Sequence, residues 1–296
     1  MKAKSRSAIS PQDVQATQRL GDGMERPSHL EGIAHEMKAA QDLGKQIELF
    51  SARVRGFDST AAYEVARLIH QARMHEGASP VGRKIGFTNR DMWRVYGVCD
   101  PIWAFVYDTS VVHLAGSRGV CRLGRFTEPR IEPEIVLHFR STPPVSDEPT
   151  DVLACIDWIA HGIEIVQSHF RDWKFQAADT IADCALHGAL LVGEPQGVDR
   201  IGPDLASQLE RFTIALSCDG NVRDTGRGSN VLGSPLAAAA HLIAVLAKQP
   251  RAEALQAGEL VTTGTLTGAL PVRAGETWST VLDGIALPGI SVAFEA

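Results

Sequence analysis

Two glutamates stand two residues apart in the segment T-E-P-R-I-E-P-E-I-V-L-H-F, which covers residues 127–139. The spacing of its apolar residues predicts a strand, in which side chains two positions apart point to the same face. Glu132 and Glu134 would therefore project side by side. Mg²⁺, Mn²⁺ and Ca²⁺ prefer such oxygen ligands. The pair is a candidate metal site; the alternative interpretation is the solvated face of a half-buried strand.

A lysine flanked by small residues is the second chemical feature, in V-G-R-K-I-G-F-T over residues 81–88. Alternation along a strand places Lys84 opposite the apolar face, and the glycines at positions 82 and 86 leave space around its ammonium group. Beside a metal site, an ammonium group can hold a substrate carboxylate or stabilise an enolate as it forms. The alternative is a solvated lysine whose glycines mark a bulge.

A polar amide interrupts the apolar segment I-E-I-V-Q-S, residues 163–168. Gln167 continues the strand face of Ile163 and Ile165, where a core residue is expected. Its carbonyl oxygen could complete a metal shell, or its amide could satisfy buried backbone groups. The pattern alone favours the second role.

The elements that must position these residues fall into three parts. Residues 1–27 are polar and are expected to form a flexible arm, residues 28–80 show helical spacing, and residues 81–296 read as a β-rich catalytic core. We expect two helices to interrupt the core, over residues 151–161 and 235–248. The pattern predicts an α+β fold with a mixed, mostly antiparallel sheet system and a smaller helical N-terminal part.

Composition narrows the class of function. The chain has 296 residues, of which 44% are hydrophobic and 22% charged, with a net charge of −6, so it can form a large core and offers no basic surface for a nucleic acid or an anionic membrane. No apolar run approaches the roughly 20 residues of a membrane span, and no signal peptide is evident. Five scattered cysteines without a C-x-x-C motif indicate neither a disulfide framework nor a zinc knuckle, which favours a reducing cytoplasm.

Several familiar catalytic motifs are missing. The sequence has no G-x-S-x-G elbow, no G-x-x-x-x-G-K-[ST] loop and no H-E-x-x-H helix, which argues against serine hydrolases, P-loop enzymes and zincins. The loop G-R-G-S-N-V-L-G resembles a dinucleotide fingerprint only superficially, because its last glycine comes late and no βαβ context surrounds it.

Taken in order, several segments resemble the 2-keto-4-pentenoate hydratase and 4-oxalocrotonate decarboxylase branch of the fumarylacetoacetate hydrolase superfamily. The resemblance runs from about residue 30 to the C-terminus, and it rests on V-G-R-K-I-G-F-T, G-V-C-D-P-I-W-A-F, P-R-I-E-P-E-I, G-I-E-I-V-Q-S, D-T-I-A-D-C-A, N-V-L-G-S-P-L and A-G-E-L-V-T-T-G-T-L-T. It implies a β-roll or barrel core of the fumarylacetoacetate hydrolase C-terminal type. It also implies a homo-oligomer, either alone or associated with a homologous decarboxylase or hydratase.

The resemblance implies a Mg²⁺-dependent enzyme, with Mn²⁺ as an alternative ion. The two metal carboxylates of the family map onto Glu132 and Glu134, its glycine-flanked lysine maps onto Lys84, and its third ligand maps onto Gln167. That third position is an aspartate in the family segment E-I-V-D-S-R, so a neutral amide here should weaken metal binding and make the ion more electrophilic.

Further positions bear on the branch of the family. Many hydratases have P-D-F-G or P-D-Y-G where this chain has P-I-W-A, and the decarboxylases have P-I-Y-G, so Ile102 leans toward the decarboxylases. Lys174 and Asp183 lie in a family-like segment near the third ligand and are expected to have supporting roles.

The resemblance implies a lyase that adds water to a 2-hydroxy-2,4-dienoate, through a metal-bound enolate, to give a 4-hydroxy-2-oxo acid, as in the catabolism of aromatic compounds. The alternatives are a decarboxylase of a 4-oxalocrotonate-like 2-oxo diacid, an acylpyruvate C–C hydrolase, and a non-catalytic partner that binds a 2-oxo acid. All four act on or bind small 2-oxo or 2-hydroxydienoic acids.

Overall fold

The computed structural model describes residues 29–90, 93–146 and 148–296, so the predicted arm over residues 1–27 lies outside the described part. Within these residues the helices are α2 (His29–Leu43), α3 (Phe50–Arg53), α4 (Ser59–His75), α5 (Trp93–Tyr96), α6 (Pro149–Leu153), α7 (Ala177–Ala182), α8 (Val198–Ile201), α9 (Leu205–Arg211) and α10 (Pro235–Lys248). Short 3₁₀ turns lie at η2 (Asp108–Ser110), η3 (Arg171–Trp173), η4 (Cys184–Leu186) and η5 (Gly228–Asn230).

The described strands form two sheets. The nine-stranded sheet has the order β2 (Ile102–Tyr107), β1 (Pro80–Gly86), β11 (Leu260–Thr262), β5 (Arg130–Phe139), β6 (Ile156–Val166), β7 (His187–Val192) and β3 (Val111–His113), with β12 (Leu270–Pro271) on β5 and β8 (Gln196–Gly197) on β6. The five-stranded sheet has the order β10 (Asn221–Arg227), β9 (Thr213–Cys218), β13 (Thr277–Asp283), β14 (Ser291–Glu295) and β4 (Arg118–Arg122).

Most neighbouring strands are antiparallel, which confirms the predicted mixed and mostly antiparallel α+β fold. The parallel pairs are β1 with β11, β3 with β7 and β4 with β14. The hairpin between β9 and β10 turns at Asp219 and Gly220, which both have positive φ, as a tight hairpin turn requires.

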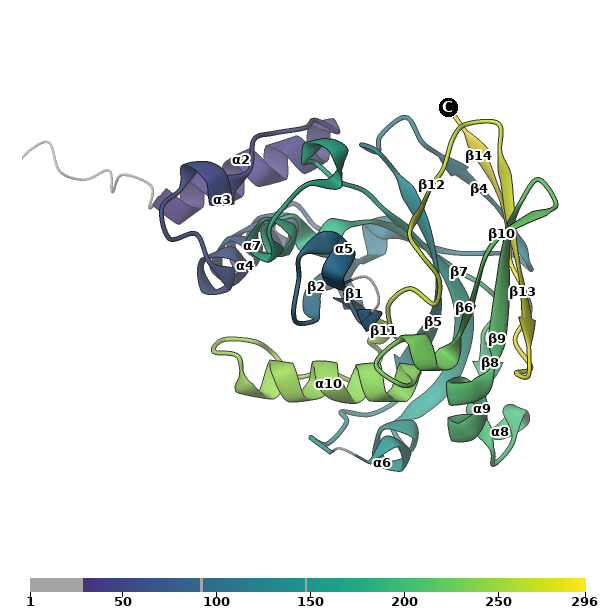
Figure 1. Cartoon of the computed structure of the whole chain (residues 1–296). Helices are drawn as coiled ribbons and strands as arrows, with labels where there is room; N and C mark the ends of the chain where they lie inside the picture. The colour runs from purple at the N-terminus through teal and green to yellow at the C-terminus, as the bar shows by residue number, and fades with distance from the viewer. Residues whose placement is uncertain (1–28, 91–92, 147) are drawn as a thin grey trace, which may run out of the picture.

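Three groups of elements pack against the nine-stranded sheet: the five-stranded sheet, the N-terminal helices with α7, and α10 (Figure 1). One face packs against the five-stranded sheet through a shared core that includes Ile163, Ile165, Leu216 and Trp278. At one end of the sheet, the helices α2, α4 and α7 cover the strands (Figure 1), and their core includes Ile102 and Val166. The N-terminal helices therefore share a core with later parts of the chain, and the domain boundaries at residues 28 and 81 stay a prediction.

The two helices expected inside the core have different outcomes. The helix over residues 235–248 is confirmed: the Ser234 side chain accepts a hydrogen bond from the Ala237 amide, and Pro235 opens the first turn. The helix over residues 151–161 is wrong, because α6 ends at Leu153 and β6 begins at Ile156. Both faces of β6 are largely buried, so its apolar residues do not alternate and fit helical spacing by coincidence.

Among the described residues, no helix combines the length and the apolar character needed to cross a membrane.

Candidate metal and substrate site

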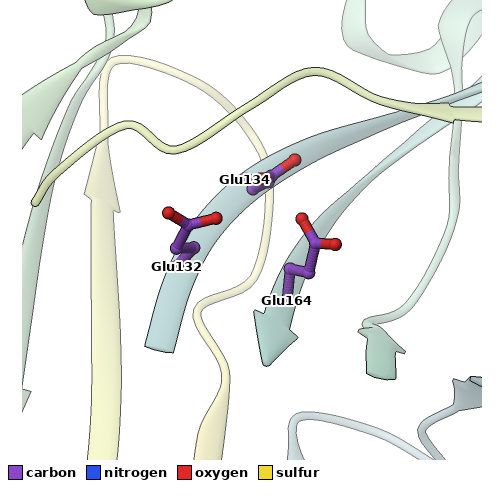
Figure 2. A group of neighbouring side chains, drawn as sticks. All are labelled: Glu132, Glu134 and Glu164. Carbon is purple, nitrogen blue, oxygen red and sulfur yellow. The ribbon is translucent and has the colours of Figure 1, made fainter. Parts of the chain in front are cut away.

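Three glutamates converge on one face of the nine-stranded sheet. In the antiparallel register of β5 and β6, Glu132 lies directly opposite Glu164, and Glu134 lies opposite Gly162. Cross-strand partners share a face, so the three side chains point to the same side of the sheet (Figure 2). One carboxylate oxygen of each lies within 4.8 Å of the others.

In both Glu134 and Glu164, one carboxylate oxygen accepts hydrogen bonds from neighbouring groups, and the other has no partner among the described residues. Oε2 of Glu134 accepts hydrogen bonds from Thr262 Oγ1 and, at 2.8 Å, from the Gly264 amide. Oε1 of Glu164 accepts from Lys84 Nζ at 2.9 Å and from His187 Nδ1 at 2.6 Å. Oε1 of Glu134 and Oε2 of Glu164 are buried and have no hydrogen-bond partner among the described residues.

Lys84 is buried within this cluster. Its side chain is 3% exposed, so the solvated alternative is wrong, whereas the expected space is present as a cavity that Lys84 and Gly86 line. Strand β1 pairs with β11, which places Lys84 beside Thr262 on the glutamate face. Burial acts to lower the pKa of Lys84, but Glu164, Glu132 and Glu134 outweigh it and raise that pKa. Lys84 therefore stays an ammonium group.

The carboxylates differ in their electrostatics. Burial raises the pKa of Glu132 to about 7, and burial together with repulsion from Glu164 and Glu132 raises the pKa of Glu134 well above its usual value. For Glu164, burial acts in the same direction, but Lys84 and His187 outweigh it and lower the pKa to about 2. Without a cation, two of the three carboxylates thus tend to hold protons.

These residues fit a divalent cation. If all three carboxylates are ionised beside one ammonium group, the buried site carries an excess of two negative charges, which either protons or a cation must offset. Two of the carboxylates also have a buried oxygen with no hydrogen-bond partner in the described part of the chain. Oxygen-only ligands suit Mg²⁺, Mn²⁺ or Ca²⁺. Glu132, Glu134 and Glu164 would hold such an ion.

A cavity opens beside the cluster, and Lys84 and Glu132 line it. Most of its remaining wall is apolar, and it includes Phe87, Ile102 and Leu186. Among the described residues that line the cavity, Lys84 is the one cationic side chain. The cavity therefore suits a small acid that has one carboxylate and an apolar remainder.

The amide of Gln167 takes the second role considered for it, the pairing of a backbone group, in place of the expected role of third metal ligand. Its Oε1 accepts a hydrogen bond from the Thr127 amide at 3.1 Å, and the residue lines a different cavity from Lys84 and Glu132. Strand β6 ends at Val166, so the extrapolated strand face does not extend to Gln167. Glu164 takes the third position in the cluster instead.

The two residues expected to support the site lie away from the cavity wall. Lys174 is exposed, with its Nζ 3.9 Å from Asp172 Oδ2. Asp183 is buried and accepts a hydrogen bond from His169 Nδ1 at 2.8 Å. Neither lines the cavity that holds Lys84.

Sequence reasoning passed over Glu164 and His187. A signal for Glu164 was available, because a charged residue between two isoleucines in the middle of an apolar strand needs a buried partner. His187 carried no such signal, since its contact with Glu164 depends on how β6 and β7 pair.

The chain matches a known protein family over most of its length. Residues 96–287 match the fumarylacetoacetate (FAA) hydrolase C-terminal family, and the chain belongs to this family.

Particular relatives refine this placement. The chain is 32% identical to a 4-oxalocrotonate decarboxylase of a Pseudomonas species over 72% of this chain and 79% of the relative. It is 31% identical to the 2-hydroxyhexa-2,4-dienoate hydratase of Comamonas testosteroni, over 76% of this chain and 82% of that one. The solved 4-oxalocrotonate decarboxylase of Pseudomonas putida G7, complexed with magnesium and adipate, superposes with a TM-score of 0.82 at 25% identity, covering 92% of this chain and 99% of that one.

Proposed function

We propose that this protein is a divalent-metal-dependent hydratase that adds water to a short 2-hydroxy-2,4-dienoate and yields a 4-hydroxy-2-oxo acid. The observation that carries the proposal is the glutamate cluster with its buried ammonium group at the wall of a largely apolar cavity. The similarity to a named dienoate hydratase supports it. Mg²⁺ or Mn²⁺ is the ion we propose, in line with the magnesium complex of the related decarboxylase.

A bound divalent cation would act as a Lewis acid toward the carboxylate and oxo oxygens of the substrate. Glu132, Glu134 and Glu164 would hold this ion. Lys84 stays protonated among the carboxylates, so it can donate a hydrogen bond to the substrate and stabilise negative charge that develops as the dienol ketonises and water adds at C4. Ile102 and Leu186 would accept the diene and limit access of bulk water.

The cavity wall favours a hydratase over a decarboxylase. A 2-oxo diacid carries a second carboxylate, and the described wall offers it no second cation. A monocarboxylic dienoate makes no such demand. The direct test incubates the protein and Mg²⁺ with 2-hydroxypenta-2,4-dienoate and follows the products by NMR, with a chelator control. Chelator-sensitive formation of 4-hydroxy-2-oxopentanoate is expected, and an unchanged dienoate would contradict the proposal.

A specific observation supports a second candidate, a decarboxylase of a 4-oxalocrotonate-like diacid. Ile102, the residue shared with the decarboxylase pattern P-I-Y-G, lines the cavity, and the decarboxylase relatives match this chain well. Incubation with 4-oxalocrotonate distinguishes the two candidates, because loss of CO₂ from it, without hydration of the dienoate, would favour the decarboxylase.

Two variants test the ligand assignment. Glu164→Gln should weaken Mg²⁺ binding at least about tenfold, because the ion loses a charged ligand. Gln167→Asp should leave Mg²⁺ affinity within about twofold, since Gln167 lines the other cavity. Tighter binding by Gln167→Asp would return the third position to Gln167.

A further inference from the structure

The contact between His187 and Glu164 depends on an irregularity in the sheet. Ile165 of β6 pairs with Ala189 of β7, yet Val166 pairs with His187, so Gly188 is an extra residue on β7. A regular ladder would pair Val166 with Gly188 and turn His187 to the face away from Glu164. The extra residue is a β-bulge, which brings His187 onto the glutamate face.

The bulge is closely packed. A Cβ atom at position 188 would lie 2.7 Å from the Ile165 carbonyl oxygen and 2.9 Å from the ring of Phe126. Only glycine allows this approach without a shift of the backbone. The sequence His-Gly at positions 187–188 thus supplies both the side chain that reaches Glu164 and the residue that permits the bulge.

Both nitrogens of the His187 ring are engaged. Nδ1 lies 2.6 Å from Glu164 Oε1 and Nε2 lies 2.8 Å from Ser110 Oγ, while the side chain is 6% exposed. A carboxylate oxygen only accepts, so Nδ1 donates to Glu164. Ser110 holds the far side of the ring and limits its rotation.

These contacts determine which oxygen of Glu164 stays available. His187 and Lys84 both donate to Oε1, and no described residue donates a hydrogen bond to the buried Oε2. If His187 were absent, the carboxylate would keep only Lys84 and could rotate about its last bond, so that neither oxygen is held toward the cation site. A ligand that rotates must be ordered when the ion binds, which lowers the affinity.

We propose that His187 is a positioning residue, held by Ser110 and the Gly188 bulge, that orients Glu164 so that one oxygen faces the cation site. This inference rests on the metal site of the proposed function. It assigns His187 no contact with the substrate and no part in proton transfer.

The experiment titrates the metal-stripped full-length protein with Mn²⁺ and measures free Mn²⁺ by electron paramagnetic resonance. His187→Leu removes the hydrogen-bond donor with little change in volume, and it should weaken Mn²⁺ binding about 10- to 100-fold. The matched variant His187→Asn places an amide N–H near the position of Nδ1, and its affinity should stay within about threefold of the wild type. Thermal unfolding of each variant checks that it is folded.

Two results would overturn the proposal. If His187→Leu binds Mn²⁺ as the wild type does, or if both variants lose affinity equally, His187 is only a structural residue. The proposed reaction is tested in the same samples with the dienoate. A wild type that binds Mn²⁺ but leaves the dienoate unchanged would overturn the hydratase and leave the role of His187 standing, whereas a wild type that binds no Mn²⁺ would overturn both.

Discussion

Arg83 and Lys84 are neighbours on β1 and both are buried, yet they lie on opposite faces of the strand. The two positive charges have different surroundings. Arg83 forms an ion pair with Glu259, and its guanidinium lies 3.9 Å from the centre of the Phe105 ring. Lys84 faces three carboxylates, and two of these have an oxygen to which none of the described residues donates a hydrogen bond. The Arg83 side pairs one cation with one carboxylate, although Arg83 Nε has no hydrogen-bond partner among the described residues, whereas the Lys84 side holds three carboxylates for one cation. This imbalance, more than burial, marks the functional side.

The largest effect is expected from a substitution on the Lys84 side of β1. Lys84→Met removes the ammonium group from the cavity wall and should lower turnover of the dienoate about 10³-fold. Metal affinity should change far less than turnover, because the three carboxylates remain and the loss of a competing cation offsets the rise in their pKa values. Steady-state kinetics and Mn²⁺ titration measure the two quantities separately. Equal losses of turnover and of affinity would mean that Lys84 mainly supports the fold of the site.

The matching change on the other side is Arg83→Met. It leaves the Glu259 carboxylate, whose side chain is only 13% exposed, without its counter-ion, and should lower the free energy of unfolding by about 3 kcal/mol. Turnover of the folded protein should stay within about threefold of the wild type. Urea unfolding followed by kinetics on the same sample measures both. A large loss of turnover in fully folded Arg83→Met would erase the distinction between the two sides.

His161 extends the comparison to a buried basic side chain that has no counter-ion among the described residues. It contacts the Glu134 carbonyl oxygen and Thr280 Oγ1, and burial lowers its pKa from 6.5 to about 4. The unfolded chain therefore binds a proton first as the pH falls, and stability is lost progressively between about pH 6.5 and 4.

The expected loss from His161 between pH 7 and 5 is about 2 kcal/mol in the free energy of unfolding. Urea unfolding at both pH values measures it, with His161→Gln as the control. The difference between the two proteins removes the contributions of the glutamates, which titrate in both. If His161→Gln loses as much stability as the wild type over this range, His161 is not the neutral group described.

The smallest effect is expected at Gln167, which follows β6 and contacts neither Arg83 nor Lys84 in the hydrogen bonds described above. Gln167→Ala removes one hydrogen bond to the Thr127 amide and should cost about 1 kcal/mol of stability. Its Mg²⁺ affinity and turnover should stay within about twofold of the wild type. Calorimetric titration with Mg²⁺ is the measurement, and a tenfold weaker affinity would count against Glu164 as the third ligand.

Local pattern predicted much of the fold and part of the site. The alternation around Glu132 and Glu134, the caps of α10 and the glycines beside Lys84 are features of short segments, so they can be read from the sequence. Glu164 and His187 depend on strand register. The first joins the cluster because β6 pairs with β5 at that residue, and the second because a bulge turns it over. Register is set by the packing of whole sheets, which a single segment does not encode.

The parallel pairing of β1 with β11 also has a consequence for folding. It joins residue 84 to residue 262, and the glutamates of the cluster lie between these two positions along the chain. Contacts of such long sequence separation form late, because a large loop must close first. During synthesis, Lys84 cannot pair with β11 until residues 260–262 have left the ribosome. A fragment that ends before β11 should therefore have no activity.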